Sequence, residues 1–187
     1  MVTVAFLLAV ASLVQASDDG IRYSPNTFAR EALGTALVAW HYCLVVEWLL
    51  HRAAHIPSAW NPLYAVHKRH HCDAYPVSSL LRPPPYVGEG GTGAFALPVV
   101  MALFLLFSLA PCQRAAFLMV SESVCFLGAS DYLHCQYHIR GSWLEGALGR
   151  WFEARRAYHF DHHRRTATNL SLGGISNWAD RMFDTRK

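Results

Sequence analysis

The chain has 187 residues, of which 53% are hydrophobic and 16% charged, and its formal net charge is +3 with neutral histidines. This length is typical of one domain, but the apolar residues gather in long runs that charged residues avoid, which excludes an ordinary soluble domain. The five cysteines include no C-x-x-C pair and are odd in number, which excludes a disulfide framework or a thiolate zinc site. We therefore predict an all-α integral membrane protein with about four transmembrane helices and no nucleic-acid partner.

The first apolar run covers residues 2–16 and ends in Val14-Gln15-Ala16, which resembles a signal-peptidase site. The run has no basic residues in front of it and is shorter than an ordinary membrane span. Residues 1–31 are therefore either a cleaved signal or a short anchor with its lumenal connection. We favour the anchor.

Three further apolar runs follow, at residues 32–50, 94–110 and 115–133. Each approaches the ~20 residues that a helix needs to cross a bilayer. The turn between the last two runs is so short that we predict an antiparallel hairpin. The polar segments 51–89 and 134–187 would form a histidine-rich helical cap, so that residues 32–187 make up one domain.

Ten of the eleven histidines fall in four short clusters, which read H-x-x-x-H, H-x-x-H-H, H-x-x-x-H and H-x-x-H-H. In a helix, positions i, i+3 and i+4 lie on one face, so each cluster would aim its imidazoles at one place. Neutral imidazole binds zinc, iron, copper and nickel, and one tetrahedral ion cannot use ten ligands. We therefore predict two metal ions, with the ligands His51, His55, His67, His70, His71, His134, His138, His159, His162 and His163.

Two acidic residues share helical faces with these ligands. Glu47 precedes His51 by four residues, and Asp131 precedes His134 by three. We predict that both carboxylates are second-shell groups that hold a ligand's other ring nitrogen, with a plain interfacial Glu as the alternative for Glu47. The eleventh histidine, His41, lies well below the first cluster, where we expect an interhelical hydrogen bond.

The basic residues predict the orientation of the chain. Of sixteen Lys and Arg, four lie in residues 52–82 and nine lie beyond His138. The positive-inside rule then puts all four histidine clusters on the cytosolic side. On that side the sequon Asn169-Leu170-Ser171 should stay unmodified, because the lumenal glycosylation enzyme cannot reach it.

The four clusters resemble the histidine boxes of the fatty acid hydroxylase and sterol desaturase superfamily: His51-Arg52-Ala53-Ala54-His55, His67-Lys68-Arg69-His70-His71, His134-Cys135-Gln136-Tyr137-His138 and His159-Phe160-Asp161-His162-His163. The residues after the last box resemble that superfamily's closing segment, which ends in a Trp, Asp-Arg, Phe-Gly-Thr pattern. Here Asp184 stands in place of the Gly, and an Ala separates the Trp from the Asp. The matching residues are Asn169, Gly173, Trp178, Asp180, Arg181, Phe183 and Thr185.

The resemblance implies a non-haem di-iron enzyme of the endoplasmic reticulum membrane that uses O2 to hydroxylate or desaturate sterols, fatty acyl chains or sphingoid bases. Electrons would come from NAD(P)H through a reductase and cytochrome b5, and zinc could replace iron during purification. Cytochrome b5 is an acidic partner, and phospholipid headgroups are an equally good alternative. Either could bind a basic surface made of Arg150, Arg155, Arg156, Arg164 and Arg165.

Two alternatives stay open at this point. A carotenoid hydroxylase is one, although the boxes of that group read H-x-x-x-x-H and are one residue longer than those here. A non-catalytic membrane metal-binding scaffold is the other. The sequence does not choose the lipid, or between hydroxylation and desaturation. The chain is shorter than most members of the superfamily, which predicts a reduced substrate tunnel or an oligomer.

Overall fold

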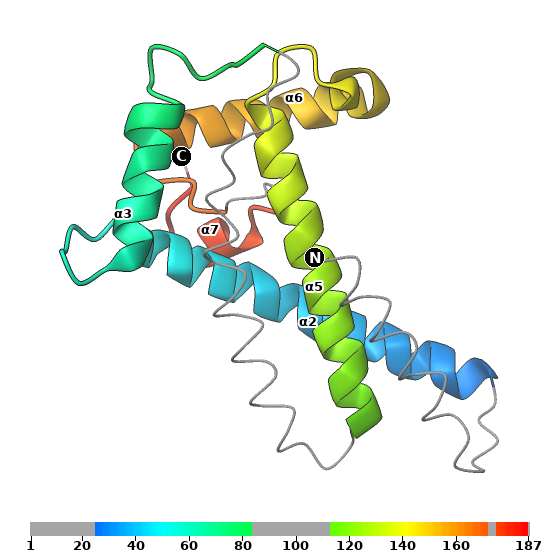
Figure 1. Ribbon diagram of the computed structural model, residues 1–187. Helices are drawn as coiled ribbons and strands as arrows, with labels where there is room; N and C mark the ends of the chain where they lie inside the picture. Colours follow the sequence, from blue (N-terminus) through cyan, green and yellow to red (C-terminus); the bar gives the residue numbers. More distant parts are fainter. Residues whose placement is uncertain (1–24, 84–112, 172–174, 187) are drawn as a thin grey trace.

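The computed structural model describes residues 25–83, 113–171 and 175–186, whose arrangement is drawn in Figure 1. Over these ranges the chain forms helices and an isolated bridge between Arg82 and Ile139, without a β-strand, so the predicted all-α class is confirmed. In chain order the elements are α2 (Pro25–Ala54), α3 (Pro62–Arg69), the π-helical turn η1 (His70–Ala74), α5 (Gln113–Tyr137), α6 (Trp143–Arg164) and α7 (Trp178–Met182).

Two of these helices are long and apolar enough to cross a membrane, namely Phe28–Ala54 in α2 and Arg114–Tyr137 in α5. They correspond to the predicted spans 32–50 and 115–133, and both extend further because each helix continues without a break into its histidine cluster. The predicted span 94–110, its hairpin turn and residues 1–16 lie outside the described residues. The total of about four spans therefore stays a prediction.

The helices α2 and α5 pack against each other where they cross (Figure 1). The rings of Trp40 and Phe126 meet edge to face with centroids 4.9 Å apart. An ion pair of 3.2 Å joins Arg114 to Glu31 nearer the start of both helices. Beyond the crossing the C-terminal ends of α2 and α5 separate, and α6 runs across the gap from the end of α5 toward α3.

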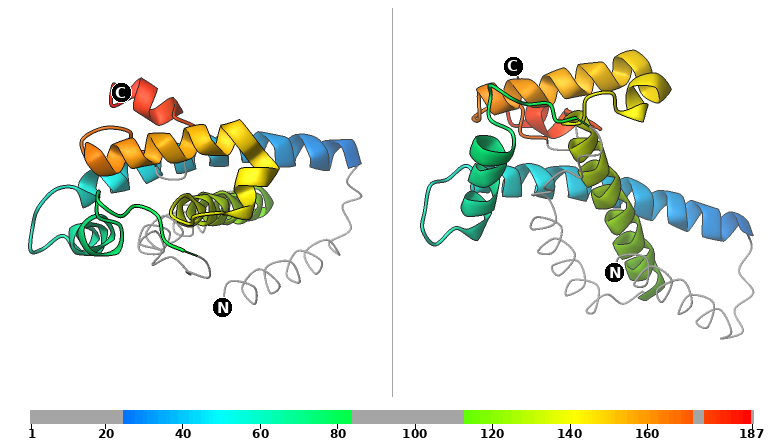
Figure 2. Two further views of the ribbon diagram at one scale, coloured as in Figure 1. Left: turned by 90° about the horizontal axis from the view of Figure 1, so that it is seen from above. Right: turned by 45° about the horizontal axis from the view of Figure 1, so that its top comes forward.

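The start of α6 is fixed by a capping box. The Ser142 side chain accepts a hydrogen bond from the Leu144 N–H, and the Glu145 side chain reaches back to the backbone N–H of Ser142. Gly149 then adopts φ 49°, a conformation that glycine takes without steric cost. The helix bends at this point, as Figure 2 shows, so that its second half can carry the last histidine cluster toward α3.

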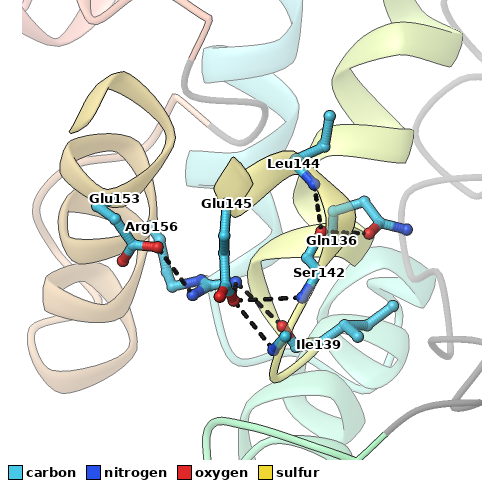
Figure 3. A network of polar contacts seen from close by, with 8 residues as sticks. Gln136, Ile139, Ser142, Leu144, Glu145, Glu153 and Arg156 are labelled. Carbon is cyan, nitrogen blue, oxygen red and sulfur yellow. Dashed lines mark hydrogen bonds and ion pairs between the residues drawn. The ribbon is translucent and has the colours of Figure 1, made fainter. Parts of the chain in front are cut away.

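Arg156 ties this second half of α6 to the end of α5 (Figure 3). Its guanidinium lies 2.7 Å from Glu145 and 3.2 Å from Glu153, and it donates a hydrogen bond of 3.0 Å to the carbonyl of Ile139. The residue is only 8% exposed. This burial contradicts the assignment of Arg156 to an exposed basic surface, because its guanidinium already binds Glu145, Glu153 and the carbonyl of Ile139.

Candidate metal centre

All four histidine clusters lie at the C-terminal ends of helices. The first and third clusters begin in the last turns of α2 and α5, and their second members, His55 and His138, directly follow the helix ends. The last turns of α6 carry the fourth cluster, and the second cluster spans the join of α3 and η1. A helix C-terminus carries a partial negative charge of about half an elementary charge, which favours a nearby cation. Several helix ends that converge on one place thus create a favourable environment for metal ions.

The ring nitrogens form two compact groups. Within each group, the atoms that could bind a metal lie within 4.8 Å of one another. The first metal group consists of His51, His55, His67, His71 and His162, and the second metal group consists of His70, His138, His159 and His163. The structure thus brings nine of the ten predicted ligands together in two groups, which is the number of metal ions that the sequence predicts.

The distances inside the groups suit a metal ion. In the first group the Nε2 atom of His67 lies 2.9 Å from that of His51 and 3.0 Å from that of His55. In the second group the Nε2 atom of His159 lies 2.9 Å from that of His138 and 3.0 Å from that of His163. Nitrogen ligands that bind one ion at ~2.0–2.1 Å are themselves ~2.9–3.4 Å apart. Each group therefore has nearly the spacing of a ligand shell.

The two H-x-x-H-H clusters divide their histidines between the groups. His67 and His71 belong to the first group, whereas His70 belongs to the second. In the last cluster the assignment is reversed, because His162 joins the first group and its neighbour His163 the second. The expectation that each cluster points to one place is wrong for these two clusters. Adjacent residues of a helix point ~100° apart, so neighbouring histidines cannot reach the same ion.

His134 lies beside the second group without joining it. Its ring centroid is 4.7 Å from that of His70 and 4.5 Å from that of His159. The side chain is 2% exposed, and among the described residues neither of its ring nitrogens has a hydrogen-bond partner. A buried imidazole without partners fits an additional ligand of the second metal ion.

Backbone carbonyls orient four of the histidines. In the first group the Nδ1 atom of His51 donates to the carbonyl of Leu170 (2.5 Å), and the Nδ1 atom of His162 donates to the carbonyl of Thr168 (2.8 Å). In the second group His138 donates to Leu80 (2.8 Å) and His163 to Tyr75 (3.1 Å). Each of these bonds puts the ring proton on Nδ1, so that Nε2 keeps its lone pair for a metal. These carbonyls were missed from the sequence, because every residue carries one and its direction depends on the fold.

The two predicted second-shell carboxylates are carried by α2 and α5, the helices that end at the first and third clusters. Glu47 is buried, and its Oε2 accepts a hydrogen bond of 2.8 Å from Ser130. The Oδ1 atom of Asp131 is also buried and has no hydrogen-bond partner in the described part of the chain. The carbonyl of Leu170 accepts the Nδ1 proton of His51, and neither ring nitrogen of His134 has a hydrogen-bond partner in the described residues. The second-shell role of both acids therefore stays a prediction.

The electrostatics of the groups favour neutral imidazoles. Burial lowers the pKa of His55 to about 4, and burial together with the charge of His55 lowers the pKa of His162 to about 3. Burial and the neighbouring His70 lower the pKa of His163 to about 2. For His67, His71, His138 and His159 the direction is the same, for the same two reasons. Neutral imidazole is the form that binds a metal ion, so the histidines of both groups fit metal ions as their cofactor.

Two further residues that the sequence singled out lie outside both groups. His41 is exposed, and its Nδ1 donates to the carbonyl of Leu37 at 2.7 Å within α2, in place of the expected interhelical hydrogen bond. Asn169 of the sequon is 1% exposed. That the sequon stays unmodified remains a prediction, and the burial of Asn169 supplies a reason for it that does not depend on topology.

Comparison with known proteins identifies one family. The sequence model of the fatty acid hydroxylases matches residues 36–185, a range that contains all ten cluster histidines and the closing segment. No curated protein and no solved structure gives a match.

Proposed function

Because the chain belongs to the fatty acid hydroxylase family, we propose that it hydroxylates or desaturates a membrane lipid at a centre of two iron ions. Family membership itself implies an oxidoreductase that acts on lipids. The observation that carries the finer proposal is the division of the histidines into two adjacent groups with ligand-like spacing. The substrate would be a sterol, a fatty acyl chain or a sphingoid base.

The bound irons would supply the O2-dependent chemistry that removes hydrogen from an unactivated C–H bond. The protein's own part is to hold neutral imidazoles in place, and the four carbonyl contacts and the burial of the rings do this. The second group is entirely buried, which limits the access of water to the reacting atoms.

The position of the groups suits a substrate from the bilayer. Both lie at the ends of helices whose preceding turns are apolar enough to cross a membrane. On α2 the side chains of Leu33, Leu37 and Val38 are 55–64% exposed, as expected for a surface in contact with lipid. A lipid chain beside α2 or α5 would therefore need to move only along the helices to reach the histidines.

We extend the proposal to the surroundings of the enzyme. Electrons would come from NAD(P)H through a reductase and cytochrome b5, and the protein would reside in the endoplasmic reticulum membrane with its clusters toward the cytosol. The distribution of Lys and Arg supports this orientation. Of the five arginines of the predicted basic surface, Arg156 is buried and Arg155 is half-buried. The exposed members left for an acidic partner or for phospholipid headgroups are Arg150, Arg164 and Arg165.

The test uses one ligand from each group. Microsomes that contain the wild-type protein should oxidise a lipid when O2 and NAD(P)H are supplied, and His70→Ala or His162→Ala should abolish this activity. His41→Ala is the matched control, since it removes a histidine that belongs to neither group. Full activity of either ligand variant would refute the proposal.

A second measurement separates an enzyme from a metal-binding scaffold. The lipids of cells with and without the gene would be compared, together with the metal content of the purified protein. Altered lipids with bound iron support the proposal and name the substrate. Zinc as the sole metal, with unchanged lipids, would contradict it.

A further inference from the structure

Asp180 in α7 is a fully buried carboxylate that accepts four hydrogen bonds. Its Oδ1 accepts from the Leu170 N–H (2.7 Å) and from the Thr185 hydroxyl (2.7 Å). Its Oδ2 accepts from the Tyr158 hydroxyl (2.7 Å) and from the Ser171 N–H (2.9 Å). In the described part of the chain no basic side chain forms an ion pair with it. Burial alone raises the pKa of Asp180, but the four hydrogen bonds outweigh burial and hold the pKa below its usual value.

The two backbone N–H groups that Asp180 binds belong to a loop of the first metal group. The carbonyl of Leu170 accepts the Nδ1 proton of His51, and the carbonyl of Thr168 accepts that of His162. Between these residues the backbone is left-handed at Asn169, with φ 56°. Left-handed geometry is uncommon outside glycine, but asparagine adopts it more readily than most residues, so contacts around the loop need only help to hold it.

The residues that follow Asp180 are attached to α2 at Trp48, one turn before the ligand His51. The indole N–H of Trp48 donates to the Thr185 hydroxyl at 3.0 Å, and the Trp48 ring stacks on Phe183 with centroids 4.1 Å apart. Trp48 also packs in one buried cluster with Leu170 and Ala179. Residues 168–171, α7 and the end of α2 thus form a continuous contact around His51.

We propose that Asp180 is a positioning residue for the first metal group. Its carboxylate fixes the backbone at residues 170 and 171, so that the carbonyls of Leu170 and Thr168 point at His51 and His162. The inference rests on the metal binding proposed above and adds a residue that does not itself contact metal or substrate. The second metal group uses carbonyls from a different segment and does not depend on Asp180.

Asparagine cannot take over this task, although it has the same shape. Each oxygen of Asp180 faces one backbone N–H, and a backbone N–H can only donate. In Asp180→Asn the amide nitrogen would therefore face a backbone donor in either orientation of the side chain. The hydroxyls of Tyr158 and Thr185 can turn and accept instead, so Tyr158→Phe removes one bond and leaves both backbone contacts intact.

The experiment measures the affinity of purified full-length protein for Zn2+ by competition with a chelator. The wild-type chain should bind two ions. Asp180→Asn should weaken one of them by about 10–100-fold and leave the other unchanged, which is the usual effect of removing an outer-shell partner. Tyr158→Phe should have a smaller effect on the same ion. Glu31→Gln makes the same chemical change near the start of α2, where Glu31 pairs with Arg114, and should leave both ions unaffected.

Two double variants identify which ion is weakened. Asp180→Asn combined with His51→Ala should bind one ion as tightly as His51→Ala alone, because both changes act on the first group. Combined with His159→Ala, it should leave no ion bound at wild-type affinity.

If Asp180→Asn binds both ions with wild-type affinity, or weakens both equally, the inference is overturned while the proposed function stands. A wild-type chain that binds no ion would refute the proposed function as well. If Asp180→Asn does not fold, Tyr158→Phe and Thr185→Val replace it, and two undiminished ions in both would overturn the inference.

Discussion

The two metal groups are built from the same repeated pair of histidine patterns, but their surroundings differ. In the first group His55 and His71 are only partly buried, whereas all members of the second group are buried. The carbonyls that orient the first group come from a loop near the C-terminal end of the chain, which Asp180 holds through its carboxylate. The comparison teaches that the sequence pattern supplies the ligands and that unrelated segments supply their support.

The support of the second group comes from the segment after η1. Leu80 and Tyr75 provide its carbonyls, and Arg82 fixes this segment to the end of α5. The Arg82 N–H donates to the carbonyl of His138 at 2.8 Å, and its guanidinium binds the carbonyl of Ala74 and the Ser79 hydroxyl. Here a basic side chain bound to one carbonyl and one hydroxyl takes the place of an acidic side chain bound to N–H groups.

The largest expected effect concerns His70 and His162, which belong to a different metal group from the other histidines of their clusters. Because His70 belongs to the second group, His70→Ala combined with His159→Ala should damage one group and leave one ion bound. His70→Ala combined with His67→Ala should damage both groups and leave none, although these two residues are neighbours in sequence. Metal analysis of the purified variants gives the count. The reverse result would be one ion bound by the His67→Ala, His70→Ala variant and none by the His70→Ala, His159→Ala variant. It would show that each cluster binds one ion.

The next effect tests the support of the second group. Arg82→Ala removes the side-chain bonds to the Ala74 carbonyl and the Ser79 hydroxyl but keeps the backbone bonds to the end of α5. The segment that carries Tyr75 and Leu80 should loosen, and the second ion should be bound about 10–100-fold more weakly. The first ion should be unaffected, which is the mirror image of the result expected for Asp180→Asn. Chelator competition measures both affinities, and a selective loss of the first ion would contradict the assignment.

A smaller effect is expected from pH in the metal-free protein. His55 and His162 have folded-state pKa values of about 4 and about 3, below the ~6.5 of an unfolded chain. The unfolded chain therefore binds more protons below pH 6.5, so the stabilisation is present above that pH and is lost as pH falls toward 4. As the pH falls from 7 to 5, each of these two histidines should lower the free energy of unfolding by about 2 kcal/mol.

Thermal unfolding of the metal-free protein in detergent measures this loss. A His162→Gln variant, which has no titrating group at this position, should lose less stability over the same range. A stability that stays constant or rises as the pH falls from 7 to 5 would contradict neutral, buried imidazoles.

The smallest effect follows from the difference in exposure. The partly exposed His55 and His71 should let a chelator reach the first ion several times faster than the second, so that metal leaves in two phases of one equivalent each. Stopped-flow mixing with a coloured chelator resolves the phases. The phase that disappears in His51→Ala belongs to the first metal group. If that phase is the slower one, the expected difference in exposure between the two groups is wrong.

Much of the site could be predicted because histidine is a rare residue whose repeated spacing has few structural uses. The convergence of the histidines and the helices that end at the clusters follow from spacing and apolar runs, whereas the ligand set and the number of ions stay predictions. The crossing of His70 and His162 was missed, although the ~100° step of a helix would have indicated it. The carbonyl contacts and the burial of Arg156 could not be predicted, because they depend on how distant segments meet. Asp180 was recognised as part of a closing segment, but its role depends on four bonds that only the fold brings together.

The central claim is that nine of the ten cluster histidines form two separate metal groups, and an anomalous-scattering map of the metal-loaded protein tests it most directly. We expect two peaks. One should lie among His51, His55, His67, His71 and His162, and the other among His70, His138, His159 and His163. A single peak, or a peak surrounded by the three histidines of one H-x-x-H-H cluster, would contradict it.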